Sequence, residues 1–243
     1  MANTIALRKQ YSTLLDEVYK LSSLTAVLDG PNELVKEGAN ANEILIPKLS
    51  MQGLADYNKS TGYVAGDVTL DYETKKCAYD RGRMFNVDAM DNIESAGIAF
   101  GRLSGEFLRT QVVPELDAYR LASYAQIPGV TTAKAALATG KEALAALRTA
   151  RGKIENAEAN LSTCYLFINP TVYGLIEDLD TTASKKAIEG FAGIIKVPSG
   201  RFYNKVKLNA SGAGGFTKDT GAVAMNFLIV DKQAAIQYQK HTV

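Results

Sequence analysis

Residues 109–125, RTQVVPELDAYRLASYA, have the composition of a helix but carry a proline inside it. Pro114 has no backbone N–H, and two carboxylates, Glu115 and Asp117, follow it at once. Because proline removes one helical hydrogen bond, we expect a kink at this point. The stretch is therefore either a bent helix that presents an acidic catalytic pair or a mechanical element, and the surrounding sequence has to decide between the two.

The two carboxylates fail as a catalytic pair. Residues two apart on a helix point about 200° away from each other, so Glu115 and Asp117 cannot share one substrate atom. Asp117 is expected to pair with Arg120, three residues on, as ordinary surface support. Glu115 falls nearer the apolar side of the helix, where we expect a buried, partnered carboxylate rather than a catalytic one.

The helix itself is predicted to run over residues 87–125. Asp88 can cap its start, and polar and apolar side chains separate onto two faces at helical spacing. Three glycines, Gly97, Gly101 and Gly105, share one stripe beside the apolar face. Since glycine costs about 1 kcal/mol inside a helix, this stripe predicts the close approach of another backbone.

A long two-stranded ribbon is predicted before this helix, over residues 43–85. EILIPKLSM (43–51) is a strand with a proline, and residues 68–85 begin with a period-two alternation of apolar side chains. The polar, glycine-rich residues 52–67 form the tip between them. An isolated hairpin is marginal in water, so this ribbon should lie against its own domain or another chain.

The rest of the chain mixes helices and strands without a βαβ repeat, which predicts an α+β fold. An amphipathic helix is expected within 4–28 and ends at Gly30-Pro31, and an alanine-rich helix is expected at 131–161. Residues 164–179 should form a strand, an Asn-Pro turn and a helix from Thr171. A strand around 194–197 with a turn and further strand up to 208, a flexible loop at 209–221 and final strands within 222–243 complete the expected elements.

Composition excludes several classes of protein. The 243 residues are 47% hydrophobic and 22% charged, which is enough to bury a core. A net charge of +1 gives no electrostatic case for gripping nucleic acid. Two cysteines, Cys77 and Cys164, lie outside any metal or disulfide pattern and are expected to be buried or half-buried thiols. No apolar run is long enough to span a membrane, and no signal peptide is evident.

Motifs for catalysis or cofactor binding also fail. ATGKEAL (138–144) lacks the first glycine and the Ser/Thr of a phosphate loop, and GAGG (212–215) lacks the glycine spacing of a dinucleotide site. The single histidine, His241, lies near the chain end, where a catalytic triad is not expected. We therefore predict no enzyme activity, no cofactor and no metal site.

Several stretches, in this order, resemble the major capsid proteins of tailed bacteriophages of the Hong Kong ninety-seven type. Residues 79–125 look like the segment that runs from the extended loop into the spine helix, and VVPELDAYRL within it matches a proline–acidic–aspartate–aromatic–arginine pattern of phage coat proteins. YLFINPTVYGLIED (165–178), GIIKVPSGRFY (193–203) and NFLIVDKQAAIQYQK (226–240) resemble the axial-domain strand, turn and helix, the strand and turn that follow, and the strand pair that returns to the peripheral domain.

The resemblance implies a domain organisation. Residues 1–42 would be an N-terminal arm, 43–85 the extended loop that lies on a neighbouring subunit, and 131–220 a compact α+β axial domain. Residues 86–130 and 221–243 would form the peripheral domain with the spine helix. Coat proteins of this kind often continue past the segment matching 226–240, whereas this sequence stops at Val243, as in a shorter variant or a trimmed chain.

The resemblance also implies a function. The chain would assemble with itself into hexamers and pentamers of an icosahedral shell around phage DNA, which it would touch by weak non-specific contacts. No scaffolding region precedes the arm, so a separate scaffolding protein is expected, together with a portal. The shell would form in the bacterial cytoplasm and become the virion capsid. Assembly contacts are predicted at Asp56, Tyr57, Asn58, Lys59, Glu115, Asp117 and Arg120.

Individual residues at the ribbon tip leave two alternatives open. Asp56, Asn58 and Lys59 either join a cross-link or salt bridge between chains or form a solvated loop tip.

Two other functions also fit the sequence. The same fold serves a protein nanocompartment that encloses enzymes, and an α+β enzyme with a dispersed site would form a discrete oligomer with a convergent pocket.

Overall fold

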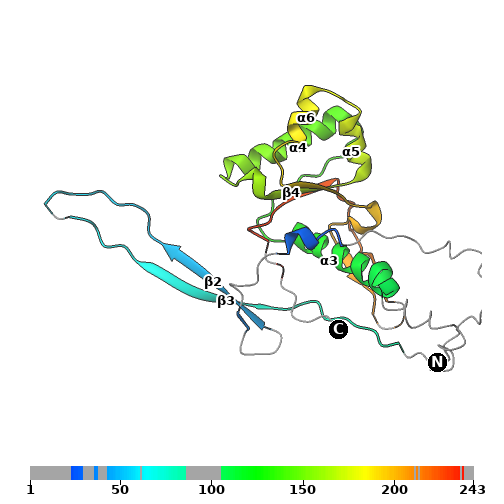
Figure 1. Cartoon of the computed structure of the whole chain (residues 1–243), viewed down its shortest axis with the longest axis horizontal. Helices are drawn as coiled ribbons and strands as arrows, with labels where there is room; N and C mark the ends of the chain where they lie inside the picture. The colour runs from blue at the N-terminus through cyan, green and yellow to red at the C-terminus, as the bar shows by residue number, and fades with distance from the viewer. Residues whose placement is uncertain are drawn as a thin grey trace, which may run out of the picture. The chain divides into compact units, whose positions relative to one another are not determined.

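The computed structural model divides into two units along the chain (Figure 1). The first, called the core unit below, comprises residues 1–29 and 86–237. The second, the ribbon unit, comprises residues 30–85 and 238–243. The structure describes residues 23–29, 36–37, 43–60, 62–85, 105–210, 212, 214–235 and 237.

A three-stranded mixed sheet lies at the centre of the core unit. β4 (Cys164–Ile168) pairs in parallel with β5 (Gly193–Lys196) and antiparallel with β8 (Phe227–Asp231). Side chains alternate along a strand, so Leu166 and Ile168 enter one hydrophobic cluster and Phe167 enters another. All three are 0% exposed. The continuous apolar run of β4 therefore belongs to a strand that is covered on both faces.

Three helices lie together on one side of β4 (Figure 1). They are α4 (Gly140–Asn156), α5 (Pro170–Glu177) and α6 (Thr182–Ile188). Each begins at a polar cap whose side chain accepts a backbone hydrogen bond from the first turn: Thr139, Asn169 and Thr181. Their inward side chains pack on Leu166 and Ile168; these are Ala143, Leu147, Val172, Ile176 and Ala187.

The parallel pairing of β4 with β5 requires a crossover, which α5 and α6 provide. The sequence predicted no repeat of βαβ units, and the sheet contains this one crossover between two of its strands. The predicted mixture of helices and strands is confirmed, as are the strand and Asn-Pro turn before α5. That helix starts at Pro170, one residue earlier than expected, because Asn169 caps it.

The other face of β4 packs on α3 (Val113–Ala125) and on a short 3₁₀ turn, η1 (Ala26–Leu28). Leu28, Leu121 and Phe202 join Phe167 in this second cluster, each 0% exposed. The remaining elements are η4 (Leu161–Thr163), η5 (Ser199–Arg201), and the antiparallel strands β6 (Val206–Leu208) and β7 (Phe216–Lys218). Residues from both ends of the sequence therefore meet on one face of the sheet.

Pro114 is accommodated by a π-helical turn, η3 (Leu108–Val112), which leads directly into α3. In that turn the Val113 N–H donates to the carbonyl of Leu108, five residues back. The wider turn shifts the carbonyls that an α-helix would place against the proline ring. The irregularity expected at Pro114 is thus a π turn that ends just before the proline. Pro114 itself is the second residue of α3.

The ribbon unit contains β2 (Glu43–Met51) and β3 (Val68–Lys76), which pair antiparallel over their full lengths. A two-residue strand, β1 (Lys36–Glu37), pairs with the start of β2. The blue-to-cyan hairpin of Figure 1 is this pair with its extended tip. The predicted ribbon is confirmed over 43–76.

Two expectations on the core unit need correction. The alanine-rich helix begins at Gly140 rather than near 131, because Thr139 and Glu142 form a reciprocal capping box there. The predicted flexible loop at 209–221 contains β7. Of the helix predicted over 87–125, residues 87–104 lie outside the described part of the chain. At Gly105, where another backbone was expected close by, an added Cβ would meet no described atom within 4 Å.

Candidate assembly site

The ribbon has two chemically different faces. Directly paired residues of antiparallel strands share a face, and successive residues alternate between faces. The register of β2 with β3 therefore places one set of side chains, the apolar face, on one side: Leu45, Pro47, Leu49, Met51, Val68, Leu70, Tyr72 and Thr74. Glu43 and Lys76, which pair with each other at the end of the strands away from the tip, fall on the same side. The opposite side, the polar face, carries Ile44, Ile46, Lys48, Ser50, Thr69, Asp71, Glu73 and Lys75.

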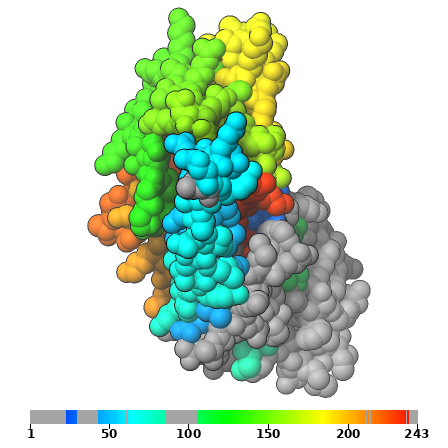
Figure 2. All heavy atoms as spheres, turned by 90° about the vertical axis from the view of Figure 1, so that its left-hand side faces the viewer, coloured from blue at the N-terminus to red at the C-terminus, as the bar shows by residue number. Residues whose placement is uncertain are grey.

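The apolar face is open to solvent in the single chain. Leu49 and Leu70, which face each other across the pair, are 56% and 54% exposed, and Met51 and Val68 are each 67% exposed. Tyr72 is 47% exposed. Figure 2 shows the blue-to-cyan atoms of the ribbon facing the viewer. Burying one such side chain fully is worth about 1.5–3 kcal/mol, and contiguous exposed apolar surface typically marks an interaction site.

The polar face is suited to water. Lys48 lies directly opposite Asp71, and Glu73 forms an ion pair with Lys75. The hydrogen bond and the charge of Lys75 lower the pKa of Glu73, to which Lys48 also contributes. These pairs stay on the surface at little cost. The ribbon is thus amphipathic and has one face that another surface can cover.

The ribbon tip is a folded turn rather than a loose loop. Asn58 and Gly62 form an isolated bridge, and the Asn58 side chain accepts a hydrogen bond from the backbone N–H of Ser60 at 2.8 Å. The rings of Tyr57 and Tyr63 lie beside the turn with centroids 5.0 Å apart. Of the predicted contact residues, Asp56 precedes this turn and Lys59 lies within it, and both are exposed. Asn58 therefore has a local role in shaping the turn, and contacts with another chain stay a prediction.

Asp117 is not a surface residue. It is 0% exposed, and its carboxyl group accepts hydrogen bonds from the Ser23 hydroxyl (2.8 Å), the Leu24 N–H (3.0 Å) and both the N–H (3.2 Å) and the hydroxyl (2.8 Å) of Thr25. The guanidinium of Arg201 lies 3.5 Å away on another side. The carboxyl group thus anchors residues 23–25 to α3.

The expected Asp117–Arg120 pair is wrong. Arg120 donates instead to the Thr25 hydroxyl at 3.1 Å and forms an ion pair with Asp29 at 3.6 Å. Both side chains therefore hold the same N-terminal segment, one from inside the core and one from its edge. The prediction that Glu115 is buried and partnered is confirmed, since it is 7% exposed and has an interaction partner.

Sequence reasoning missed Ser23, Thr25 and Arg201 as partners of Asp117. They lie 84 to 94 residues away along the chain, so no local spacing connects them. One signal was available, because an aspartate in the middle of an otherwise apolar helix face requires hydrogen-bond donors from elsewhere. That signal identifies the need for partners but does not say which residues supply them.

The described part of the chain also contains titratable residues of the kinds most often used in catalysis or metal binding. Within it, no cluster of three or more His, Cys, Asp or Glu residues could hold a metal ion. Cys164 is buried and Cys77 is half-buried, as predicted, and burial raises the pKa of the Cys164 thiol. His241 lies outside the described residues. Among the described residues, no helix is long and apolar enough to cross a membrane.

Comparison with known proteins gives one likeness. No protein-family model matches the sequence, and no curated protein matches it. A solved structure from Mycobacterium phage Che8 is similar, with a TM-score of 0.54 over 83% of this chain and 77% of that chain. The two sequences are 14% identical, so the likeness concerns the fold alone. The chain therefore shares its fold with a phage protein.

Proposed function

We propose that this chain is the major capsid protein of a tailed phage and assembles into the icosahedral shell that encloses the genome. The observation that carries the proposal is the exposed apolar face of the ribbon, where five large apolar side chains are 47–67% exposed. The fold likeness to a phage protein and the coat-protein pattern around Pro114 support it.

Function here means assembly rather than a reaction. The apolar face of each ribbon would be covered by a neighbouring copy, while the polar face stays in water. Many modest contacts of this kind, repeated over a closed shell, add up to a durable particle without any single strong interface. A net charge of +1 per chain limits the repulsion between like copies packed side by side.

The proposal includes the partners that such a shell needs. Copies of this chain would form hexamers and pentamers, guided by a separate scaffolding protein and closed at one vertex by a portal. The packaged DNA would make weak, non-specific contacts with the inner surface. The particle would assemble in the cytoplasm of the bacterial host.

Expression of the chain alone, and together with a candidate scaffolding protein, tests the proposal. Light scattering and negative-stain microscopy should reveal shells, capsomers or curved sheets. A monodisperse monomer or small oligomer, unchanged at high concentration and with the scaffolding protein, would contradict it. Particles that enclose enzymes in place of nucleic acid in the native source would identify a nanocompartment instead.

A matched pair of variants tests the role of the apolar face. Leu70 and Thr69 are neighbours on β3 but point to opposite faces. Leu70→Lys should reduce the yield of particles about tenfold or more, because it buries a charge in every ribbon contact. Thr69→Lys should leave the yield within about twofold, since its side chain stays in water. Equal losses in both variants would show that the ribbon does not dock by this face.

A further inference from the structure

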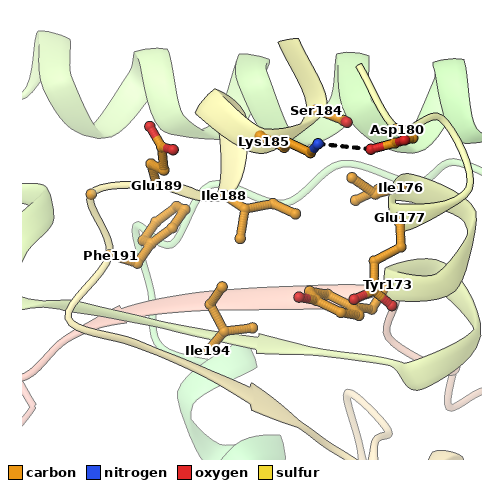
Figure 3. A pocket seen from close by; sticks show the side chains of 11 residues that line it. Tyr173, Ile176, Glu177, Asp180, Ser184, Lys185, Ile188, Glu189, Phe191 and Ile194 are labelled. Carbon is orange, nitrogen blue, oxygen red and sulfur yellow. Dashed lines mark ion pairs between the residues drawn. The ribbon is translucent and has the colours of Figure 1, made fainter. Parts of the chain in front are cut away.

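A pocket of about 600 Å³ opens on the helical side of the core unit (Figure 3). Its walls come from α5, from α6 and from the turn that leads into β5. Ile188, Phe191 and Ile194 point into it, and Ile176 closes it toward the core at 1% exposure. The floor is therefore apolar and continuous with the hydrophobic cluster beneath it.

The rim of the pocket is acidic. Glu177, Asp180 and Glu189 surround it, and Lys185 is the single cation among the residues that line it. Lys185 is already paired with Asp180, with its Nζ 2.8 Å from Asp180 Oδ1. Among the residues that line the pocket, two carboxylates, Glu177 and Glu189, thus exceed the positive charge, and the nearby Lys196 ammonium lies over the ring of Tyr173, 4.0 Å from its centroid. The pocket favours an occupant with an apolar body and an adjacent positive charge.

The wall that α6 contributes is held in place from behind. Arg151 of α4 donates hydrogen bonds to the carbonyls of Lys186 (2.8 Å) and Glu189 (3.0 Å) at the end of α6. At the start of α6, the Ser184 hydroxyl donates to the carbonyl of Thr181 at 2.8 Å, so this buried polar group of the wall is satisfied. The pocket is formed before any occupant arrives, which lowers the cost of binding.

An exposed segment of the same unit has the complementary character. Residues 126–134, QIPGVTTAK, connect α3 to α4, have no helix or strand and are exposed throughout. Ile127 and Val130 are 51% and 38% exposed, and Lys134 carries the only charge of the segment. The Asn226 amide donates to the Ala135 carbonyl at 2.9 Å and fixes the end of the segment. The whole connection runs from the end of α3 at Ala125 to the start of α4 at Gly140, and irregular connections of this length are either functional or linkers.

We propose that residues 126–134 of one copy dock into the acidic-rimmed pocket of a second copy. Ile127 and Val130 would cover the apolar floor, and Lys134 would lie against Glu177 and Glu189. One copy supplies the segment and the other the pocket, so the contact is head-to-tail and can close a ring. This inference rests on the proposed function and names a contact between neighbouring copies that is separate from the ribbon.

Cross-linking between two singly substituted chains tests the contact. Thr131 lies in the segment, and Thr182 is the first residue of α6, two residues after the lining residue Asp180; both threonines are exposed and each is replaced by cysteine. Each substitution is made in a Cys77→Ser background, whereas Cys164 is kept because it is buried. The two chains are assembled together and treated with a short bis-maleimide, so only contacts between copies give mixed dimers.

We expect mixed dimers from the Thr131→Cys and Thr182→Cys pair in particles. The control pair replaces Thr182→Cys by Thr149→Cys, an exposed threonine of α4 outside the pocket, and should give none. Particles without mixed dimers, or equal dimers in both pairs, would overturn the docking proposal and leave the shell proposal standing. If no particles form under any condition, the proposed function fails, and this inference fails with it.

A charge exchange tests the assigned partners. Lys134→Glu should lower the cross-linking yield about two- to fivefold, the range expected for one exposed ion pair. Glu177→Lys in the chain that supplies the pocket, the one with Thr182→Cys, should restore it, because the attraction returns with reversed signs. A yield that the first change leaves intact, or that the second lowers further, would show that Lys134 does not lie at this rim.

Discussion

Similar apolar side chains are buried in the core unit and exposed in the ribbon. In β4, Leu166 is 0% exposed between two layers of helix, whereas Leu70 in β3 is 54% exposed on an open hairpin. Both positions follow from the same period-two geometry of a strand. The difference lies in what covers the strand: the core unit covers both faces of β4, whereas in the described part of the ribbon only Ile44, at 8% exposure, is a buried apolar residue. This contrast is the basis of our proposal that another chain covers the apolar face of the ribbon.

The same contrast holds for charged residues. Asp117 in the core unit is fully buried and accepts four hydrogen bonds from residues 23–25, whereas Asp71 in the ribbon is exposed and lies opposite Lys48. A buried carboxyl group depends on its partners, and an exposed one has water in their place. Equivalent substitutions in the two units should therefore differ greatly in effect.

The largest difference is expected between two aspartates. Asp117→Ala should lower the free energy of unfolding by about 3–5 kcal/mol, because it leaves Arg201 and the donors of residues 23–25 without their buried acceptor. Asp71→Ala should change it by less than about 0.5 kcal/mol. Urea titration of unassembled chains measures both. A loss below about 1 kcal/mol for Asp117→Ala would show that the buried network does not anchor the segment.

Two leucines give the next comparison. Leu166→Ala should destabilise the unassembled chain by about 2–5 kcal/mol, because it opens a cavity in the core. Leu70→Ala should cost less than about 0.5 kcal/mol in the unassembled chain, yet it should lower the stability of particles. Similar losses from both variants in unassembled chains would mean that the apolar face of the ribbon is already covered within one chain.

Two glycines within α4 sharpen the account of packing in the core unit. A Cβ at Gly140 would lie 2.2 Å from the Leu175 carbonyl oxygen, whereas a Cβ at Gly152 meets nothing within 4 Å. Gly140→Ala should therefore cost about 1–3 kcal/mol through overpacking. Gly152→Ala should stabilise by about 0.5–1 kcal/mol through helix propensity. Thermal unfolding of both variants decides whether α4 and α5 are as close as described.

The smallest expected effect is a dependence of thermal stability on pH. Backbone hydrogen bonds from Ala138 and Thr139 lower the pKa of Glu142 in the capping box of α4. A lowered pKa stabilises the fold above the unfolded value of about 4.3, and this contribution disappears as pH falls through the folded value. Glu142→Gln should therefore lower the Tm at pH 7, and the difference from the unsubstituted chain should shrink toward pH 3. A difference that is constant with pH would contradict the charged cap.

Local chemistry made much of the fold predictable. The period-two alternation from Val68 defined β3, and Asn169-Pro170 marked the end of β4 and the start of α5. Alanine-rich residues 131–139 were misassigned as helix because propensity alone does not reveal that Thr139 and Glu142 cap the helix later. The π turn was also hidden, since Pro114 predicts an irregularity without specifying its form.

The candidate site, too, could be predicted from the sequence only in part. The amphipathic faces of the ribbon follow from sequence once the register is known, and the register depends on the tip geometry. The partners of Asp117 and the pocket between α5, α6 and β5 are assembled from distant segments, which no local pattern specifies. The proposed contacts between chains are harder still to predict, because the surfaces that would meet belong to different copies.

Hydroxyl-radical footprinting of assembled particles against dissociated chains tests the central claim most directly. Labelling of Met51 and Tyr72 on the apolar face should fall several-fold on assembly, while acetylation of Lys48 on the polar face should stay within about twofold. This result would establish that the ribbon docks by its apolar face in the shell. Undiminished labelling of Met51 and Tyr72 in intact particles would contradict the account.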